Sequence, residues 1–213
     1  MVGVPLARRT RRRDQKHSCP SRIEAVLGYA ALGWPVVPGA HPLRHGPRAC
    51  SCDRVGCPDP GAHPLSPAWH MQATTDTTRL THWWQREPEA NVILPTGRVF
   101  DVFDVPLATG LTALARIDAE GAHSGPVAAN GDRVLFYVAT RGNPDDEDEW
   151  WSCHLDCDPA TIDASPGLRW HCRDSFVLAP PSTLPTGQPV SWLRAPDGRP
   201  LPDPLRILEH LAD

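Results

Sequence analysis

Residues 50–69 read CSCDRVGCPDPGAHPLSPAW, and their cysteines and histidine indicate a loop that binds a metal ion. Cys50, Cys52, Cys57 and His63 follow one another as C-x-C-x4-C-x5-H. Thiolates and imidazoles are the ligands that zinc prefers, and four of them close a tetrahedral structural site. The loop has little apolar content, so a bound ion would supply folding energy that it lacks. We therefore predict a structural Zn²⁺ site at these four residues.

Other interpretations of the loop stay open on sequence alone. His63 lies in the turn-like sequence PGAHP, and His41 and His45 are alternative fourth ligands. The cysteines would otherwise be ordinary small residues, or one disulfide with a spare thiol. The chain has seven cysteines, an odd number, and their clustering favours reduced thiols and metal over a disulfide framework. This usage predicts a cytoplasmic protein.

Length and charge limit the class of protein. The 213 residues suffice for one domain, which we expect to span residues 21–213. No apolar run approaches the ~20 residues of a membrane span, so we expect no contact with a membrane. Residues 1–20 are basic, whereas the remainder is net acidic. We predict that this segment is a disordered arm, either simply solvated or bound to DNA phosphates. Its candidate phosphate contacts are Arg8, Arg9, Arg11, Arg12 and Arg13.

Hydrophobic periodicity predicts helices mixed with antiparallel hairpins. Residues 21–24 have the sequence of a capping box, and Asp76 is a second candidate helix cap. Helices are predicted at 23–31, 76–86, 107–119 and 203–212. Strands are predicted at 34–38, 91–94, 99–105, 127–129, 133–139 and within 168–179, where one long strand or a pair is expected. Asn130-Gly131 is typical of a hairpin turn. These elements place the chain in the α+β class.

Four segments along the chain carry a family resemblance. They are AALGWPVVP at 30–38, the cysteine loop ending in PGAHP, ATTDTTRLTHWWQREPEANVILPTG at 73–97 and FVLAPPSTLPTGQPVSW at 176–192. In this order they resemble the N-terminal domain of bifunctional DNA primase/polymerases, the prim-pol branch of the archaeo-eukaryotic primase group. The resemblance covers roughly residues 23–193. It implies a prim-pol-like fold, with an RRM-type antiparallel sheet packed with helices and a zinc-binding loop beside it.

The resemblance also implies template-dependent nucleotidyl transfer, with single-stranded or primed DNA and nucleotides as partners. Family members hold Mg²⁺ or Mn²⁺ with two aspartates, spaced D-x-D, on the strand after the Thr-Gly turn. Side chains alternate along a strand, so this spacing directs both carboxylates to one face. The matching candidates here are Asp101 and Asp104, which are three residues apart. They would point to opposite faces unless a β-bulge brings them together.

Two further positions depart from the family pattern. Val134 stands where the family has a histidine that contacts the incoming triphosphate. Arg133 is then the candidate nucleotide-binding residue, although it should project to the other face. A third acid is expected ahead of the APPS segment, and Asp174 is the candidate, out of register.

Three hypotheses follow. The chain is an active DNA primase/polymerase, an inactive zinc-stabilised fold that binds DNA or a replication partner, or a regulatory domain that no longer contacts nucleic acid. The sequence contains no G-K-[ST] motif of a helicase. A helicase or another replication protein would therefore be a partner in trans.

Overall fold

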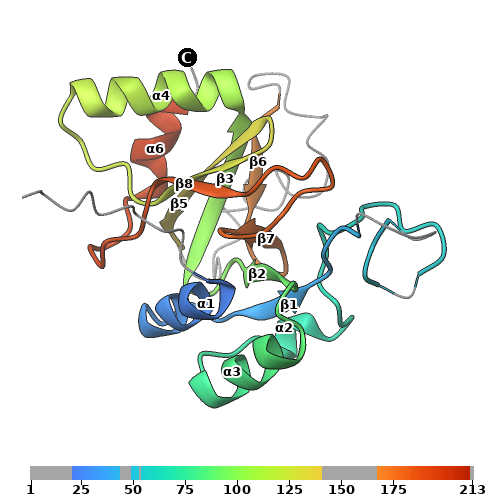
Figure 1. Cartoon of the computed structure of the whole chain (residues 1–213). Coiled ribbons are helices and arrows are strands. Elements are labelled where there is room, and N and C mark those ends of the chain that lie inside the picture. The colour runs from blue at the N-terminus through green and yellow to red at the C-terminus, as the bar shows by residue number, and fades with distance from the viewer. Residues whose placement is uncertain (1–20, 44–48, 53, 141–166, 212–213) are drawn as a thin grey trace, which may run out of the picture.

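The computed structural model describes residues 21–43, 49–52, 54–140 and 167–211 (Figure 1). The predicted basic arm with its five arginines lies outside these ranges, and so does the alternative zinc ligand His45. Within the described ranges, no helix is long and apolar enough to cross a membrane.

Helices are mixed with antiparallel strands along the chain, which confirms the predicted α+β class. The helices are α1 (Arg22–Ala31), α2 (Trp69–Gln72), α3 (Thr77–Arg86), α4 (Leu107–Ala119) and α6 (Pro204–Leu211). The strands are β1 (Val37–Gly39), β2 (Asn91–Pro95), β3 (Phe100–Pro106), β4 (Val127–Asn130), β5 (Arg133–Ala139), β6 (Arg169–His171), β7 (Phe176–Ala179) and β8 (Ser191–Arg194). They form a sheet of order β1-β2-β7 and a larger sheet of order β6-β3-β5-β4-β8.

Both helix caps expected from the sequence are present. The Ser21 hydroxyl accepts a hydrogen bond from the Glu24 backbone N–H, and the Glu24 carboxylate accepts one from the Ser21 N–H at 2.8 Å. The Asp76 carboxylate accepts hydrogen bonds from the backbone N–H groups of Thr78 and Arg79 at the start of α3. Each cap satisfies donors that the first turn of a helix leaves unpaired.

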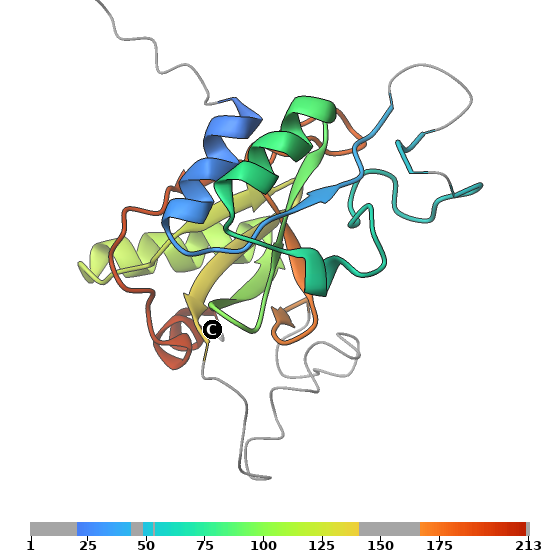
Figure 2. The ribbon, with the colours of Figure 1, turned by 90° about the horizontal axis from the view of Figure 1, so that it is seen from below.

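The larger sheet is covered on both faces, and β3 contributes to both cores. Phe100 and Val102 belong to the core that the larger sheet shares with α1, α3 and β2. Phe103 and Val105 belong to a second core beneath α4 and α6. Figure 1 shows α4 and α6 on one side of the sheet and α1 and α3 on the other, and Figure 2 shows α1 beside α3. Alternation along β3 therefore assigns successive residues to opposite cores.

The chain crosses between the sheets three times, which sequence reasoning did not anticipate. The crossings lie between β2 and β3, between β6 and β7, and between β7 and β8. Residues 168–179 therefore contain two strands that do not pair with each other. Hydrogen bonds join the first two crossovers. Thr96 donates its backbone N–H to Ser175 O at 2.9 Å and its hydroxyl to Cys172 O. Gly97 has φ +80° and packs so closely that a Cβ there would lie 2.2 Å from Arg173 Cα.

Two helical glycines differ in the space around them, and the same substitution should have opposite effects at each. A Cβ at Gly110 in α4 would lie 2.5 Å from Val134 Cβ on β5, whereas one at Gly28 in α1 meets nothing within 4 Å. We expect Gly110→Ala to lower the free energy of unfolding by about 1–3 kcal/mol through overpacking. Gly28→Ala should raise it by about 0.5–1 kcal/mol, because alanine favours the helix. Urea unfolding of the two variants measures both values, and equal effects would contradict the packing seen here.

Candidate functional site

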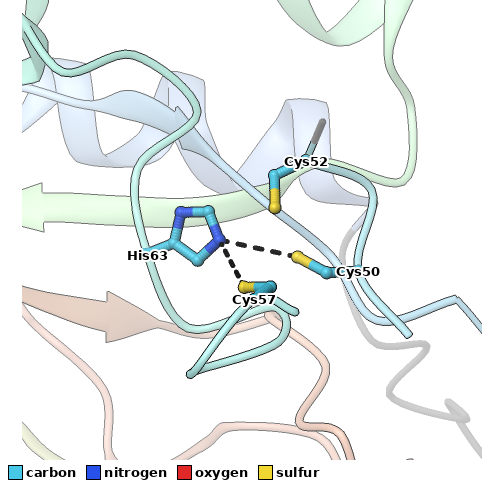
Figure 3. A group of neighbouring side chains, drawn as sticks. All are labelled: Cys50, Cys52, Cys57 and His63. Atoms are coloured by element: carbon cyan, nitrogen blue, oxygen red, sulfur yellow. Dashed lines mark hydrogen bonds between the residues drawn. The ribbon is translucent and has the colours of Figure 1, made fainter. Parts of the chain in front are cut away.

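Cys50, Cys52, Cys57 and His63 converge at the base of the cysteine loop (Figure 3). Their ligand atoms all lie within 4.8 Å of one another. His63 Nε2 is 3.5 Å from Cys50 Sγ and 3.3 Å from Cys57 Sγ. Tetrahedral zinc with bonds of about 2.0–2.3 Å separates its ligands by ~3.5–3.8 Å. The donor set and its spacing therefore fit one zinc ion.

Hydrogen bonds around the cluster orient its ligands. His63 Nδ1 lies 2.8 Å from the Pro64 carbonyl oxygen, which can only accept, so Nδ1 carries the proton and Nε2 is left for an ion. The Gly61 N–H donates to Cys50 Sγ at 3.3 Å. Among the described residues the cluster contains His63 and not His41, so the geometry favours the ligand set first predicted.

The thiols of the cluster differ in acidity. The Arg54 backbone N–H lowers the pKa of Cys52 to about 7, and desolvation raises the pKa of Cys57 to about 11. Without metal, Cys57 therefore carries its proton at neutral pH. Zinc binds thiolates, so binding must displace at least this proton.

The second candidate site lies on the larger sheet, where Asp101 and Asp104 are kept apart. β3 pairs with β5 residue by residue, from Phe100 opposite Ala139 to Pro106 opposite Arg133, without a register shift. A bulge that would bring the two carboxylates together is therefore not present in this strand. Asp104 shares the face of Phe100 and Val102, and Asp101 lies on the opposite face. The expected pair of catalytic aspartates is not assembled.

Cationic side chains surround the Asp104 carboxylate, whose side chain is only 7% exposed. Arg133 Nε donates to Oδ1 at 2.6 Å. On the other oxygen, Oδ2, His171 Nε2 lies at 3.3 Å and Arg169 Nη1 at 3.8 Å. A carboxylate only accepts, so His171 Nε2 carries a proton. Sequence reasoning missed the roles of Arg169 and His171, because only the pairing of β6 with β3 brings them to this face.

Arg133 connects two segments of backbone through hydrogen bonds to their carbonyl oxygens. It is 16% exposed, and its Nη2 donates to the carbonyl oxygens of Asp104 at 2.8 Å and Gly167 at 2.6 Å. With the bond to the Asp104 carboxylate, protein acceptors use three of its five N–H donors. Arg133 shares the face of Asp104, since it pairs with Pro106, two residues further along β3.

The positions that neighbour Asp104 on its face carry no other carboxylate. On β3 they are Val102 and Pro106, on β5 Leu135, and on β6 Arg169, which lies directly opposite. Asp174, the candidate third acid, lies in the turn after β6 with its side chain 73% exposed and its carboxylate 3.9 Å from Arg173 Nε. Two divalent ions need several oxygen ligands. A single carboxylate that is already paired with a guanidinium cannot supply the ligands for two divalent ions.

A comparison with known protein families matches most of the chain. The model of the family described as bifunctional DNA primase/polymerase, N-terminal, matches residues 26–205. The chain belongs to this family. No curated protein matches it. This prim-pol chain thus combines the fold of its family with a cysteine cluster suited to zinc and a sheet face on which Asp104 is paired with cations.

Loss of one cluster thiol should abolish zinc binding. We expect the purified protein to contain one zinc ion per chain, and Cys57→Ser to contain none and to unfold at a lower temperature. Zinc added to metal-free protein should release protons near neutral pH, because Cys57 is protonated beforehand. Elemental analysis and a pH indicator measure these effects. Cys172→Ser, outside the cluster, is the matched control, and a similar loss of zinc in it would refute the assignment.

Removal of the Asp104 charge should be costly, because it leaves the mostly buried Arg133 without its counter-ion. We expect Asp104→Asn to lower the free energy of unfolding by about 3–5 kcal/mol. The control is Asp118→Asn, which breaks the Asp118–Arg194 pair, whose side chains are 49% and 48% exposed. This change should cost less than about 1 kcal/mol. Chemical denaturation measures the free energy of unfolding of both variants. Similar decreases in the two would contradict a structural role for the Asp104 cluster.

Proposed function

We propose that this prim-pol chain binds single-stranded or primed DNA as a replication module and does not itself carry out nucleotidyl transfer. The observation that carries the proposal is the pairing of Asp104 with Arg133 at 2.6 Å. Nucleotidyl transfer by two metals needs a group of negative oxygens that holds the ions against the reacting phosphates. Among the paired positions of β3, β5 and β6 around it, Asp104 is the only acid on this face, and Arg133 neutralises it. Arg169, which lies opposite Asp104, repels a divalent ion.

Membership of the family supports DNA and nucleotides as ligands. The predicted phosphate contacts of Arg8, Arg9, Arg11, Arg12 and Arg13 belong to the same proposal. A helicase or another replication protein in trans would supply the chemistry that this chain lacks. The described cysteines are free thiols, which supports a cytoplasmic setting.

Template-dependent incorporation should be absent. We expect zinc-loaded protein to bind oligonucleotides but to add no nucleotides to single-stranded or primed DNA, with Mg²⁺ or with Mn²⁺. Extension assays with labelled primers measure this directly. Incorporation that is lost in both Asp101→Ala and Asp104→Ala, while circular dichroism shows that both variants remain folded, would overturn the proposal and make the chain an active primase/polymerase.

A reconstructed site provides the positive control. Pro106 shares the face of Asp104 and Arg169 lies opposite it, so Pro106→Asp with Arg169→Asp groups three carboxylates there. Aspartate also suits position 106, which is the N-cap of α4. We expect the double variant to bind Mn²⁺ more tightly than the natural chain, as titration with paramagnetic detection would show. Equal affinity in the two proteins would mean that the missing acids do not explain inactivity.

A further inference from the structure

Two adjoining hollows lie beside the cysteine loop and form a groove. Figure 2 shows α2, α3 and the cysteine loop, which contribute its walls. The hollows have volumes of about 560 and 320 Å³ and share Leu65, Ser66 and Glu87 in their walls. The larger hollow lies between the cysteine loop, α2 and β7, and the smaller one lies beside α3. Each volume falls in the range of pockets that hold small organic ligands, about 300–1,000 Å³.

Aromatic side chains line both hollows. Trp69 and Phe176 face the larger one and contact each other edge to face, with ring centroids 5.3 Å apart. Trp83 lines the smaller one, and the Arg79 guanidinium lies over its ring at 5.1 Å. All three rings are only half-buried. Such rings provide platforms on which nucleic-acid bases stack irrespective of sequence.

A guanidinium group borders each of the two hollows. Arg54 lines the larger hollow and Arg86 the smaller one, and both are exposed and form no ion pair with a described residue. Glu87 lies where the hollows meet. Its carboxylate disfavours a phosphate at the centre of the groove but can accept hydrogen bonds from base amino groups. Each hollow thus combines a cation with an aromatic ring, which suits a strand that turns its phosphates toward the arginines and its bases toward the rings.

We propose that this groove is the site where the chain holds single-stranded nucleic acid, with bases on Trp69, Phe176 and Trp83 and phosphates on Arg54 and Arg86. The inference rests on the proposed function in requiring that the chain bind DNA, and it adds the surface that does so. This surface is distinct from the sheet face around Asp104. Cys52 and His63 also line the larger hollow, so the zinc site forms part of its wall.

Salt-dependent binding of a fluorescent thymidine 12-mer tests the phosphate contacts. We expect the zinc-loaded double variant Arg54→Ala/Arg86→Ala to bind more weakly and to lose about 0.7 per arginine from the slope of log affinity against log salt. The charge-matched control is Arg199→Ala/Arg206→Ala, which removes two exposed arginines elsewhere. It should leave the slope unchanged. Equal slopes in the two double variants would overturn the inference.

Stacking is tested separately. Trp69→Leu and Trp83→Leu should each weaken binding at least about fivefold, the lower end for loss of one stacked base. A 12-mer that carries 5-bromodeoxyuridine should crosslink under ultraviolet light to peptides containing residues 65–87 or Phe176, a result that needs no variant. A mononucleotide that competes at equal concentration would show that the groove holds one base and its phosphate, and not an extended strand.

The outcomes separate this inference from the proposed function. Tight DNA binding with crosslinks confined to β6 or the sheet face around Asp104 would refute the groove and leave the DNA-binding proposal intact. No binding to any oligonucleotide would refute both. Incorporation of nucleotides that depends on Asp101 and Asp104 would refute the non-catalytic proposal alone.

Discussion

Burial of β3 on both faces is the constraint on which the rest of the structure depends. Its even-numbered residues, such as Phe100 and Val102, pack toward α1 and α3, and Phe103 and Val105 pack toward α4 and α6. A slip of one residue in register would exchange these two sets. The alternation is therefore fixed by two cores at once, and the faces of Asp101 and Asp104 are fixed with it. To bring carboxylates three residues apart onto one face, the strand would have to pack differently in both cores.

Neighbouring cationic side chains balance the charge of Asp104. A buried carboxylate is costly unless a partner neutralises it. Arg133 supplies the charge and also ties Asp104 to Gly167 through backbone carbonyl oxygens. The Asp104–Arg133 pair thus connects the end of β3 to the entry into β6. An aspartate on this strand therefore has a structural role of its own.

Local features of the sequence were predictable, and long-range ones were not. The caps at Ser21 and Asp76, the helix at 107–119 and the turn after Asn130 are each specified by neighbouring residues, and the structure contains them. The fold class and the convergence of the cysteine loop were also predicted, since the spacing of the ligands carries that information. β8 and α2 are short and lacked a periodic signal. The partners of Asp104 come from β5 and β6. No local sequence pattern predicts that strands so far apart in the chain will pair with β3.

The joined crossovers at Thr96 and Ser175 have a mechanical consequence. Two of the three connections between the sheets, β2–β3 and β6–β7, meet at one seam, where backbone and hydroxyl hydrogen bonds join them and Gly97 packs closely against Arg173. Sliding of one sheet over the other would break these bonds and drive Gly97 against Arg173. The seam therefore resists relative motion of the two sheets and does not act as a hinge between them. The smaller sheet is thereby held in one position relative to the larger sheet.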